Sequence, residues 1–389
     1  MKNKVIKVVL PLIMSLLLTG CWDSVEIDRK AFVSAIGVDS GEEVNLKESK
    51  ALVNGNKKID DLKLVRITYS FPDIRNMDTQ KGTTEKLSLT IDGYSLTDAY
   101  IKAISKTSRN LHFGHSKLLI ISEEFFEHPD LVNEFMDYIG RTPSINRAMA
   151  VAVSEGRAEE LLALKPMMED GIDNYIISLL GNSSTFGNFK PVSVTKYIEM
   201  IKNDGIAILP LFSKNGDNDA TLKGGIIIDN FSVKEKLSIK DMDNLQILKG
   251  NIGACKKVIV KDNHPIDYYI KEVSTKLKPE LINNQLYINY IVETKGDLSG
   301  YYSNGSSLND VGIKEIEDDL NKAIGRELLD TTEYIREGMK LDILGIKENL
   351  EKYHPMLWKD IKDQWPNTFY NSKFSITVST SIKTIGIAN

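Results

Sequence analysis

A cysteine near the start of the chain stands in a context that favours covalent lipid attachment. Leu18-Thr19-Gly20 precedes Cys21, and the last two of these are the small residues that a signal peptidase requires before its cleavage point. The Cys21 thiol can take a diacylglycerol, and the amine freed by cleavage can then be acylated. Two or three chains hold a protein on a membrane, whereas one chain binds only marginally. We therefore predict that Cys21 is the lipid anchor and the first mature residue.

Residues 1–20 have the pattern of a secretory signal peptide. Lys2, Lys4 and Lys7 give a basic start, and Val8 to Leu18 forms a short apolar stretch. The alternative is an uncleaved membrane-spanning helix, but that stretch has only 11 residues, whereas about 20 are needed to cross a bilayer. We expect the mature protein to be tethered to a membrane and not to span it.

Composition and charge indicate an exported globular body. Of the 389 residues, 42% are hydrophobic, which supplies enough apolar surface for two or three domains. The net charge of −5 becomes −5 − 3 = −8 when the three lysines of the signal peptide are removed. An acidic body is a poor partner for nucleic acid or an anionic membrane surface, so we expect no nucleic-acid binding and attachment through the lipid.

The rest of the sequence lacks the motifs of common enzymes. It contains no phosphate-binding loop, no dinucleotide fingerprint and no Gly-x-Ser-x-Gly nucleophile turn. His112 and His115 are close in sequence, but Gly114 separates them and no third ligand is near, so we interpret them as part of a turn and predict no metal site. Cys255 has no disulfide partner once Cys21 is lipidated, so it is predicted to be a small packed residue. We expect no enzymatic activity and no cofactor.

Four residues are candidates for a structural or interaction role. Trp358 and Trp365 are seven residues apart and could form an aromatic docking patch. The helical spacing of Trp358 and Ile361 instead favours packing in a core. Trp22 and Asp23, directly after the predicted anchor, are the other two candidates.

Strands and helices alternate in the first part of the chain. Ser95 and Asp98 have the pattern that opens a helix, and Pro129 suits the first turn of another. We predict strands at 31–38, 65–71, 87–91, 117–122 and 147–153, with helices between the later ones. Residues 21–154 are therefore expected to form an N-terminal domain with an α/β sheet and crossover helices.

The remainder of the chain predicts a helical middle and a strand-rich end. Helices are expected at 155–165, 172–181 and 193–203, so residues 155–214 form a helical middle region or small second domain. The polar segment Lys214 to Ala220 is the best candidate for a linker. Residues 220–389 are expected to form an antiparallel sheet packed by a long helix that Asn309 caps. The predicted fold class is α+β, a mixed α/β multi-domain protein.

Several short motifs occur in a specific order and spacing along the chain. They are Gly20-Cys21-Trp22-Asp23 with Glu26-Ile27, Ile36-Gly37-Val38-Asp39, Ile104 to Arg109, Phe113-Gly114-His115-Ser116-Lys117, Arg141-Thr142-Pro143 and Lys340-Leu341-Asp342-Ile343-Leu344-Gly345, followed by Trp358 and Trp365. Together they resemble the GerAC family of lipoproteins, the C subunits of nutrient germinant receptors in spore-forming bacteria, and the resemblance covers nearly the whole chain. The chain departs from the family at Ile346-Lys347, where a Gly is common.

This resemblance implies a non-enzymatic subunit on the outer face of the cytoplasmic membrane, which in a spore is the inner membrane. It also implies an A subunit and a polytopic B subunit as partners, and three domains of mixed structure. We expect a structural or coupling component without a ligand pocket, and no direct small-molecule binding. The alternative is a solute-binding lipoprotein of an uptake system, which would have two similar lobes around its ligand. Consecutive strands followed by a long helix in the second half argue against it.

Overall fold

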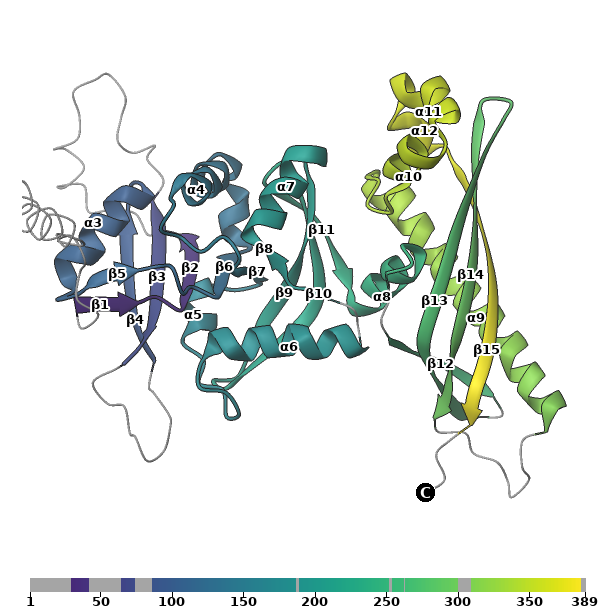
Figure 1. Cartoon of the computed structure of the whole chain (residues 1–389), viewed down its shortest axis with the longest axis horizontal. Coiled ribbons are helices and arrows are strands. Elements are labelled where there is room, and N and C mark those ends of the chain that lie inside the picture. Colours follow the sequence, from purple (N-terminus) through teal and green to yellow (C-terminus); the bar gives the residue numbers. More distant parts are fainter. Residues whose placement is uncertain are drawn as a thin grey trace, which may run out of the picture.

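The computed structural model describes residues 29–41, 64–73, 86–186, 189–251, 254–261, 263–299 and 309–385. These residues form an elongated molecule with a large sheet toward the N-terminal side and a smaller sheet toward the C-terminal side (Figure 1). Helices and strands are mixed in both parts. The predicted α+β fold class is confirmed.

The larger sheet has nine strands in the order β11-β10-β9-β7-β6-β2-β3-β4, with β8 paired to β7. Its centre is parallel, because β2 pairs with β6, β6 with β7, and β7 with β9 in the same direction. Antiparallel hairpins extend it at both edges. The strands are β2 (Ala35–Ser40), β3 (Val65–Pro72), β4 (Lys86–Gly93), β6 (Leu118–Ser122), β7 (Ala150–Ser154), β8 (Val192–Ser193), β9 (Ile206–Asn215), β10 (Asp219–Asp229) and β11 (Ser232–Ser238); β1 (Lys30–Phe32) and β5 (Asn110–His112) form a separate parallel pair.

Helices cover both faces of this sheet, and the central strand β6 shows why. Every residue of β6 is buried: Leu119 and Ile121 join the core on one face, and Leu118 and Ile120 join the core on the other. A strand that is apolar on both faces requires a layer on each side. The first core receives α3 (Leu96–Lys106), α4 (Pro129–Arg141) and α7 (Val194–Asp204), and the second receives α5 (Ala158–Leu162), α6 (Ile172–Phe186) and α8 (Ile239–Leu248); a short 3-10 helix, η5 (Glu124–Glu127), follows β6.

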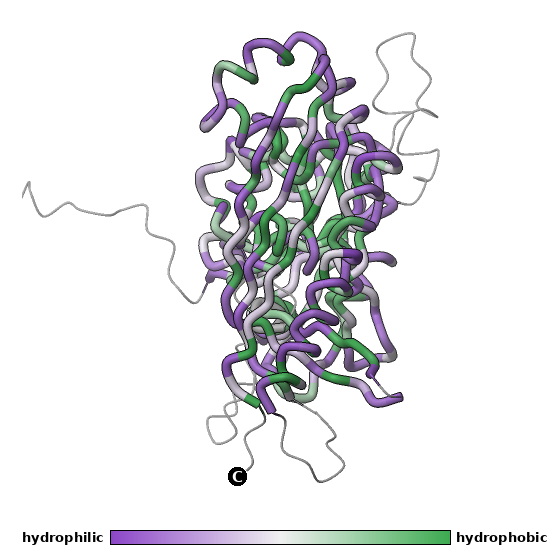
Figure 2. The backbone as a smooth tube through the Cα atoms, turned by 90° about the vertical axis from the view of Figure 1, so that its right-hand side faces the viewer, coloured by the Kyte–Doolittle hydropathy of each residue, from purple (hydrophilic) through white to green (hydrophobic). Residues whose placement is uncertain are grey.

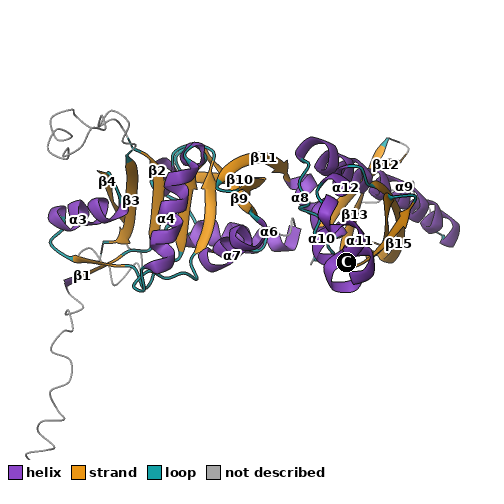
Figure 3. Cartoon of the chain, turned by 90° about the horizontal axis from the view of Figure 1, so that it is seen from above, coloured by secondary structure: helices purple, strands orange, loops and turns teal. Residues whose placement is uncertain are grey.

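The smaller sheet has the order β12-β13-β14-β15 and carries a long helix on one face. Figure 3 shows this helix, α9, lying along the sheet beside β15. Seen from the C-terminal side, the long strands change repeatedly between hydrophilic and hydrophobic residues (Figure 2). The elements are β12 (Cys255–Lys261), β13 (His264–Ile282), β14 (Gln285–Ser299), α9 (Asp310–Glu333), the π-helical turn η6 (Tyr334–Met339), α10 (Ile346–Tyr353), α11 (Pro355–Ile361), the 3-10 turn η7 (Lys362–Gln364), α12 (Asn367–Tyr370) and β15 (Lys373–Ile385).

One hydrophobic core connects the two sheets. It begins under the large sheet with residues of α5 and α6, continues through Met242 and Leu245 of α8, and reaches Leu320 and Leu328 of α9. Cys255 is fully buried in this core, and burial raises the pKa of its thiol to about 12. Its predicted role as a small packed residue is confirmed.

Three local predictions differ from the structure. Lys214 to Ala220 is not a linker, because β9 and β10 pair across it and Lys214 lies opposite Ala220. The predicted first strand is two strands, β1 and β2, with a break between them. The last strand, β15, runs parallel to β14. After β14 the chain returns through α9 to the end of the sheet at which β14 begins. The smaller sheet is therefore mixed and not purely antiparallel.

The helical middle region also contributes strands. Within 155–214, β9 pairs with β7 before it in sequence and with β10 after it. Strands from all three predicted parts therefore pair within the nine-stranded sheet, and one hydrophobic core extends from this sheet to the smaller one. The division into residues 21–154, 155–214 and 220–389 stays a proposal. In the described part of the chain, no helix combines the length and apolarity needed to span a membrane.

Candidate functional site

The stretch Ile36-Gly37-Val38-Asp39 forms the buried strand β2 and positions helix α5. Asp39 Oδ1 accepts a hydrogen bond from the backbone N–H of Ala158 at 2.7 Å, and Oδ2 accepts one from Glu159 at 3.0 Å. The first N–H groups of a helix have no partner within the helix, so this carboxylate satisfies two of them. Asp39 is therefore a helix cap supplied from a distant strand.

Gly37 allows the same helix to approach the strand closely. A Cβ at this position would lie 2.7 Å from Leu162 Cδ1 and 3.4 Å from Ala158 Cβ. Burial raises the pKa of Asp39, and the amide hydrogen bonds from α5 oppose that rise. The Asp39 carboxylate therefore stabilises the fold and is buried away from solvent.

We expect Asp39→Ala to lower the free energy of unfolding by about 2 kcal/mol, because two helix N–H groups lose their acceptor in a dry site. Ser193→Ala is the matched control, since Ser193 caps α7 at an exposed position through the N–H of Lys196. Loss of an ordinary cap costs about 1 kcal/mol. Urea unfolding of both variants measures the difference, and an Asp39→Ala cost no larger than that of Ser193→Ala would contradict this role.

The Phe113–Lys117 stretch forms a turn between β5 and β6. Ser116 Oγ donates to the backbone oxygen of Val33, and Asn146 Nδ2 donates to the backbone oxygen of Ser116. The rings of His112 and His115 lie 5.6 Å apart between centroids. Burial, Lys30 and the neighbouring histidine lower the pKa of His112. Among the residues that the structure describes, no group of three possible metal ligands is present.

The Lys340–Gly345 stretch repeats the device seen at Asp39. Asp342 Oδ1 accepts from the N–H of Ile346 at 3.0 Å and Oδ2 from that of Lys347 at 2.6 Å, so the carboxylate caps α10. Gly345 precedes this helix at φ +77°, a conformation that glycine adopts without a steric penalty. Burial raises the pKa of Asp342, against the effect of those amide hydrogen bonds.

The structure brings Trp358 and Trp365 together. Their ring centroids are 5.5 Å apart with an edge-on geometry, and Trp365 also lies 5.7 Å from the fully buried Phe369. Both tryptophans are half-buried and pack against the main core. Cys21, Trp22 and Asp23 lie outside the described residues, so their roles stay predictions.

The described part of the chain contains cavities, two of which stand out. The larger, of 460 Å³, lies between the end of α8, the smaller sheet and α10, where it is lined by Lys249, Tyr290 and Lys352. Asn349 also lines it, and its buried Oδ1 has no hydrogen-bond partner among the described residues. The other cavity, of 220 Å³, lies beside β1. Neither cavity is shown to bind a ligand, so the expected absence of a ligand pocket and of small-molecule binding stays a prediction.

Sequence reasoning missed a buried polar cluster between α8, β12 and α9. Lys257 Nζ donates to Asn244 Oδ1 at 2.5 Å and pairs with Glu327 Oε2 at 2.9 Å. Lys240 binds the other oxygen of Glu327 at 2.9 Å. The only signal in the sequence is that Lys257 lies on the same face of β12 as Cys255 and Ile259, which indicates burial. The apolar Val258 and Val260 on the other face obscure this pattern.

The chain matches two family models in succession. Residues 23–214 match the spore germination protein N-terminal domain, and residues 223–386 match the C-terminal domain described as spore germination B3/GerAC like. It is 22% identical to spore germination protein YndF of Bacillus subtilis over 99% of this chain and 98% of that protein. It is also 22% identical to spore germination protein KC of the same organism, over 100% and 98%. The crystal structure of the GerBC protein has the same fold, with a TM-score of 0.58 and 17% identity over 90% of this chain and 98% of that chain.

Proposed function

We propose that this chain, which belongs to the GerAC-like family of spore germination proteins, is the lipid-anchored C subunit of a nutrient germinant receptor. Family membership gives it a role in spore germination. The proposal adds that it holds its receptor partners, an A subunit and a polytopic B subunit, in a responsive arrangement, and that it catalyses no reaction.

The observation that carries this proposal is that the acidic residues of the family-like motifs, Asp39 and Asp342, have structural roles within the fold. Asp39 and Asp342 each give both carboxylate oxygens to helix N–H groups. A carboxylate engaged in this way is not placed to transfer a proton to a substrate or to ligate a metal. Residues with such structural roles suit a subunit that provides a rigid surface.

The shape of the molecule argues against a solute-binding lipoprotein. Such a protein closes two similar lobes around its ligand. Here one sheet has nine strands with a parallel centre and the other has four strands, and a single core joins them. The two parts are therefore not similar lobes around a cleft.

For attachment, we propose the diacylated Cys21 as the anchor and the outer face of the cytoplasmic membrane, or the spore inner membrane, as the location. The sequence from Lys2 to Gly20 supports this as a signal peptide. We propose that the lipid contributes attachment and not folding, since both described cores are built from residues after Lys30.

We expect Cys21→Ala to leave the protein folded and to move it from the membrane pellet to the soluble fraction. Cys255→Ala is the matched control, because it removes the other cysteine of the chain without touching the anchor. Fractionation is done in a strain without the partner subunits, which could retain the protein by themselves. Recovery of the Cys21→Ala protein in the pellet, at the level of the Cys255→Ala protein, would refute the lipid anchor.

A further inference from the structure

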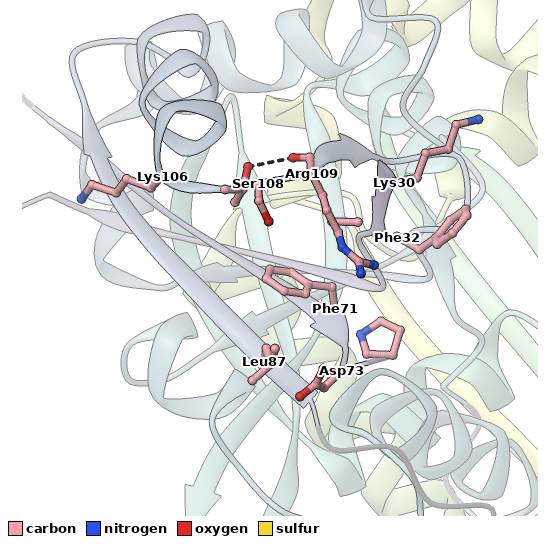
Figure 4. A pocket seen from close by; sticks show the side chains of 11 residues that line it. Lys30, Phe32, Phe71, Asp73, Leu87, Lys106, Ser108 and Arg109 are labelled. Carbon is pink, nitrogen blue, oxygen red and sulfur yellow. Dashed lines mark hydrogen bonds between the residues drawn. The ribbon is translucent and has the colours of Figure 1, made fainter. Parts of the chain in front are cut away.

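The smaller cavity lies where the described chain begins, between β1, β3, β4 and the turn after α3 (Figure 4). Its walls are apolar where Phe32, Phe71 and Leu87 line it. Three cationic residues also line it, namely Lys30, Lys106 and Arg109. The volume of 220 Å³ suits a small group and not a large organic ligand.

Arg109 is the cation that enters the cavity. Its guanidinium points into the space between Phe32 and Phe71, whereas Lys30 and Lys106 extend outward from the rim (Figure 4). Within the described ranges, no residue forms a hydrogen bond or an ion pair with this guanidinium. Thr107 Oγ1 donates to the backbone oxygen of Arg109 at 2.8 Å and holds the turn that aims the side chain.

The charge of the cavity is opposite to that of the protein. Three cations and one acid, Asp73, give the lining a formal charge of 3 − 1 = +2, on a chain whose net charge is −5. Asp73 is itself engaged in an interaction. The local charge therefore attracts an anion to this point of an otherwise acidic surface.

The geometry of a guanidinium selects the kind of anion. Arginine presents a planar set of N–H donors that matches two oxygens of a phosphate, and it is less strongly hydrated than a lysine ammonium. The aromatic and aliphatic walls beside it accept a short apolar group next to the charge. These two properties together fit a phosphate ester with carbon atoms attached.

The position of the cavity brings it near a membrane, if Cys21 is the anchor as proposed above. Lys30 is nine positions after Cys21, and a fully extended chain spans at most about 3.6 Å per residue. The cavity then lies within about 30 Å of the lipidated residue. A membrane surface that contains anionic lipids presents many phosphate headgroups at that distance.

We propose that this cavity binds a phosphate group through Arg109, with Lys30 and Lys106 at its rim. A headgroup of an anionic phospholipid and a free phosphate are the two sources of that chemistry. Binding of a headgroup would orient the N-terminal part of the subunit on the membrane, which attachment through a lipid alone does not do.

The experiment uses the full chain with Cys21→Ala, so that the covalent lipid does not dominate membrane binding. Its flotation is measured with vesicles of phosphatidylglycerol and phosphatidylcholine in a 1:1 mixture and of phosphatidylcholine alone. Calorimetry with inorganic phosphate and with glycerol 1-phosphate forms the second arm. Arg109→Gln is compared with Arg326→Gln, which removes the same charge from an exposed site on α9.

We expect binding in one arm that Arg109→Gln weakens about tenfold and Arg326→Gln leaves unchanged. Loss confined to the vesicle arm assigns the headgroup as the source, and loss in the calorimetric arm assigns a free phosphate. Equal binding by the two variants in both arms, or no binding by the parent chain, overturns the proposal. Melting temperatures establish that Arg109→Gln is folded. The Cys21→Ala fractionation has its own readout, so failure of the anchor and failure of this site are distinguishable.

Discussion

Glu327→Ala is expected to lower the free energy of unfolding by about 3 kcal/mol, because it leaves the ammonium of Lys257 buried without its anionic partner. The Lys257 side chain is only 7% exposed, and its Nζ lies 2.9 Å from Glu327 Oε2. Asn244 remains as a neutral acceptor, so the cost falls at the lower end of the values for broken buried pairs.

Lys257→Met is the matched control for this prediction. It removes the buried charge but keeps an apolar side chain of similar length, and Glu327 retains Lys240 as a partner. Exchange of a buried charge for an apolar group is often close to neutral, so we expect a cost of about 1 kcal/mol or less. Urea unfolding of both variants gives the comparison, and equal losses would contradict the assignment of Lys257 as the uncompensated charge.

The same pair predicts a pH dependence. Burial alone would raise the pKa of Glu327, but the ammonium groups of Lys257 and Lys240 outweigh it and hold the pKa below its ordinary value of 4.5. A carboxyl whose pKa is lower in the folded state stabilises the fold above its unfolded pKa and loses this effect as pH falls through the folded pKa. The difference in stability between the parent chain and Glu327→Gln should therefore shrink below about pH 4.5.

Trp365→Ala is expected to lower the free energy of unfolding by about 3 kcal/mol, the lower end of the cost of truncating a core tryptophan, because the ring is half-buried. It lies between Trp358 and the fully buried Phe369, and Phe369 in turn lies 6.3 Å from Phe374 of β15. Removal of the indole therefore leaves a gap beside Phe369, the residue that contacts the smaller sheet.

Tyr353→Ala provides the control, since Tyr353 is 62% exposed at the end of α10 and its loss should cost less than about 0.5 kcal/mol. Thermal melts are recorded together with germination of spores that carry each variant. An unchanged melting temperature with lost germination in Trp365→Ala would assign this tryptophan to an interface with a partner instead of to the core.

Local patterns in the sequence predict most of the helices and strands, because the spacing of apolar residues matches the positions that the structure buries. The alternation of 65–71 and the apolar run at 118–121 identify β3 and β6, and Ser95 caps α3 through the N–H of Asp98 as its type suggests. These features depend on neighbours within a few residues, which a single sequence contains.

What the sequence leaves undetermined depends on distant partners. Asp39 caps a helix that begins more than a hundred residues later, and no local pattern relates the two. The polar segment Lys214 to Ala220 has the composition of a linker, but pairing of its flanks makes it a hairpin. In β12, Val258 and Val260 are exposed at 48% and 73% while Lys257 is buried, because Glu327 and Asn244 on other elements compensate the lysine.

The candidate site was predictable only in part for the same reason. The tryptophan pair follows from spacing along the chain, since Trp358 and Trp365 are close in sequence. The phosphate-binding cavity assembles β1, β3, β4 and the turn after α3, and its charge becomes apparent only when Lys30 and Arg109 are brought together. Composition gives only the net charge of the whole chain, which is negative, whereas the lining of the cavity is positive.

Co-purification from spore inner membranes tests the central claim most directly. Membranes of spores that carry an affinity-tagged copy of this chain are treated with a short amine-reactive crosslinker, and the tagged protein is isolated under denaturing conditions. A subunit that couples receptor partners should recover the polytopic receptor subunit in a crosslinked product that disappears when the partner gene is deleted. Isolation of the tagged chain without any other receptor subunit, under conditions that crosslink other membrane complexes, would contradict the account.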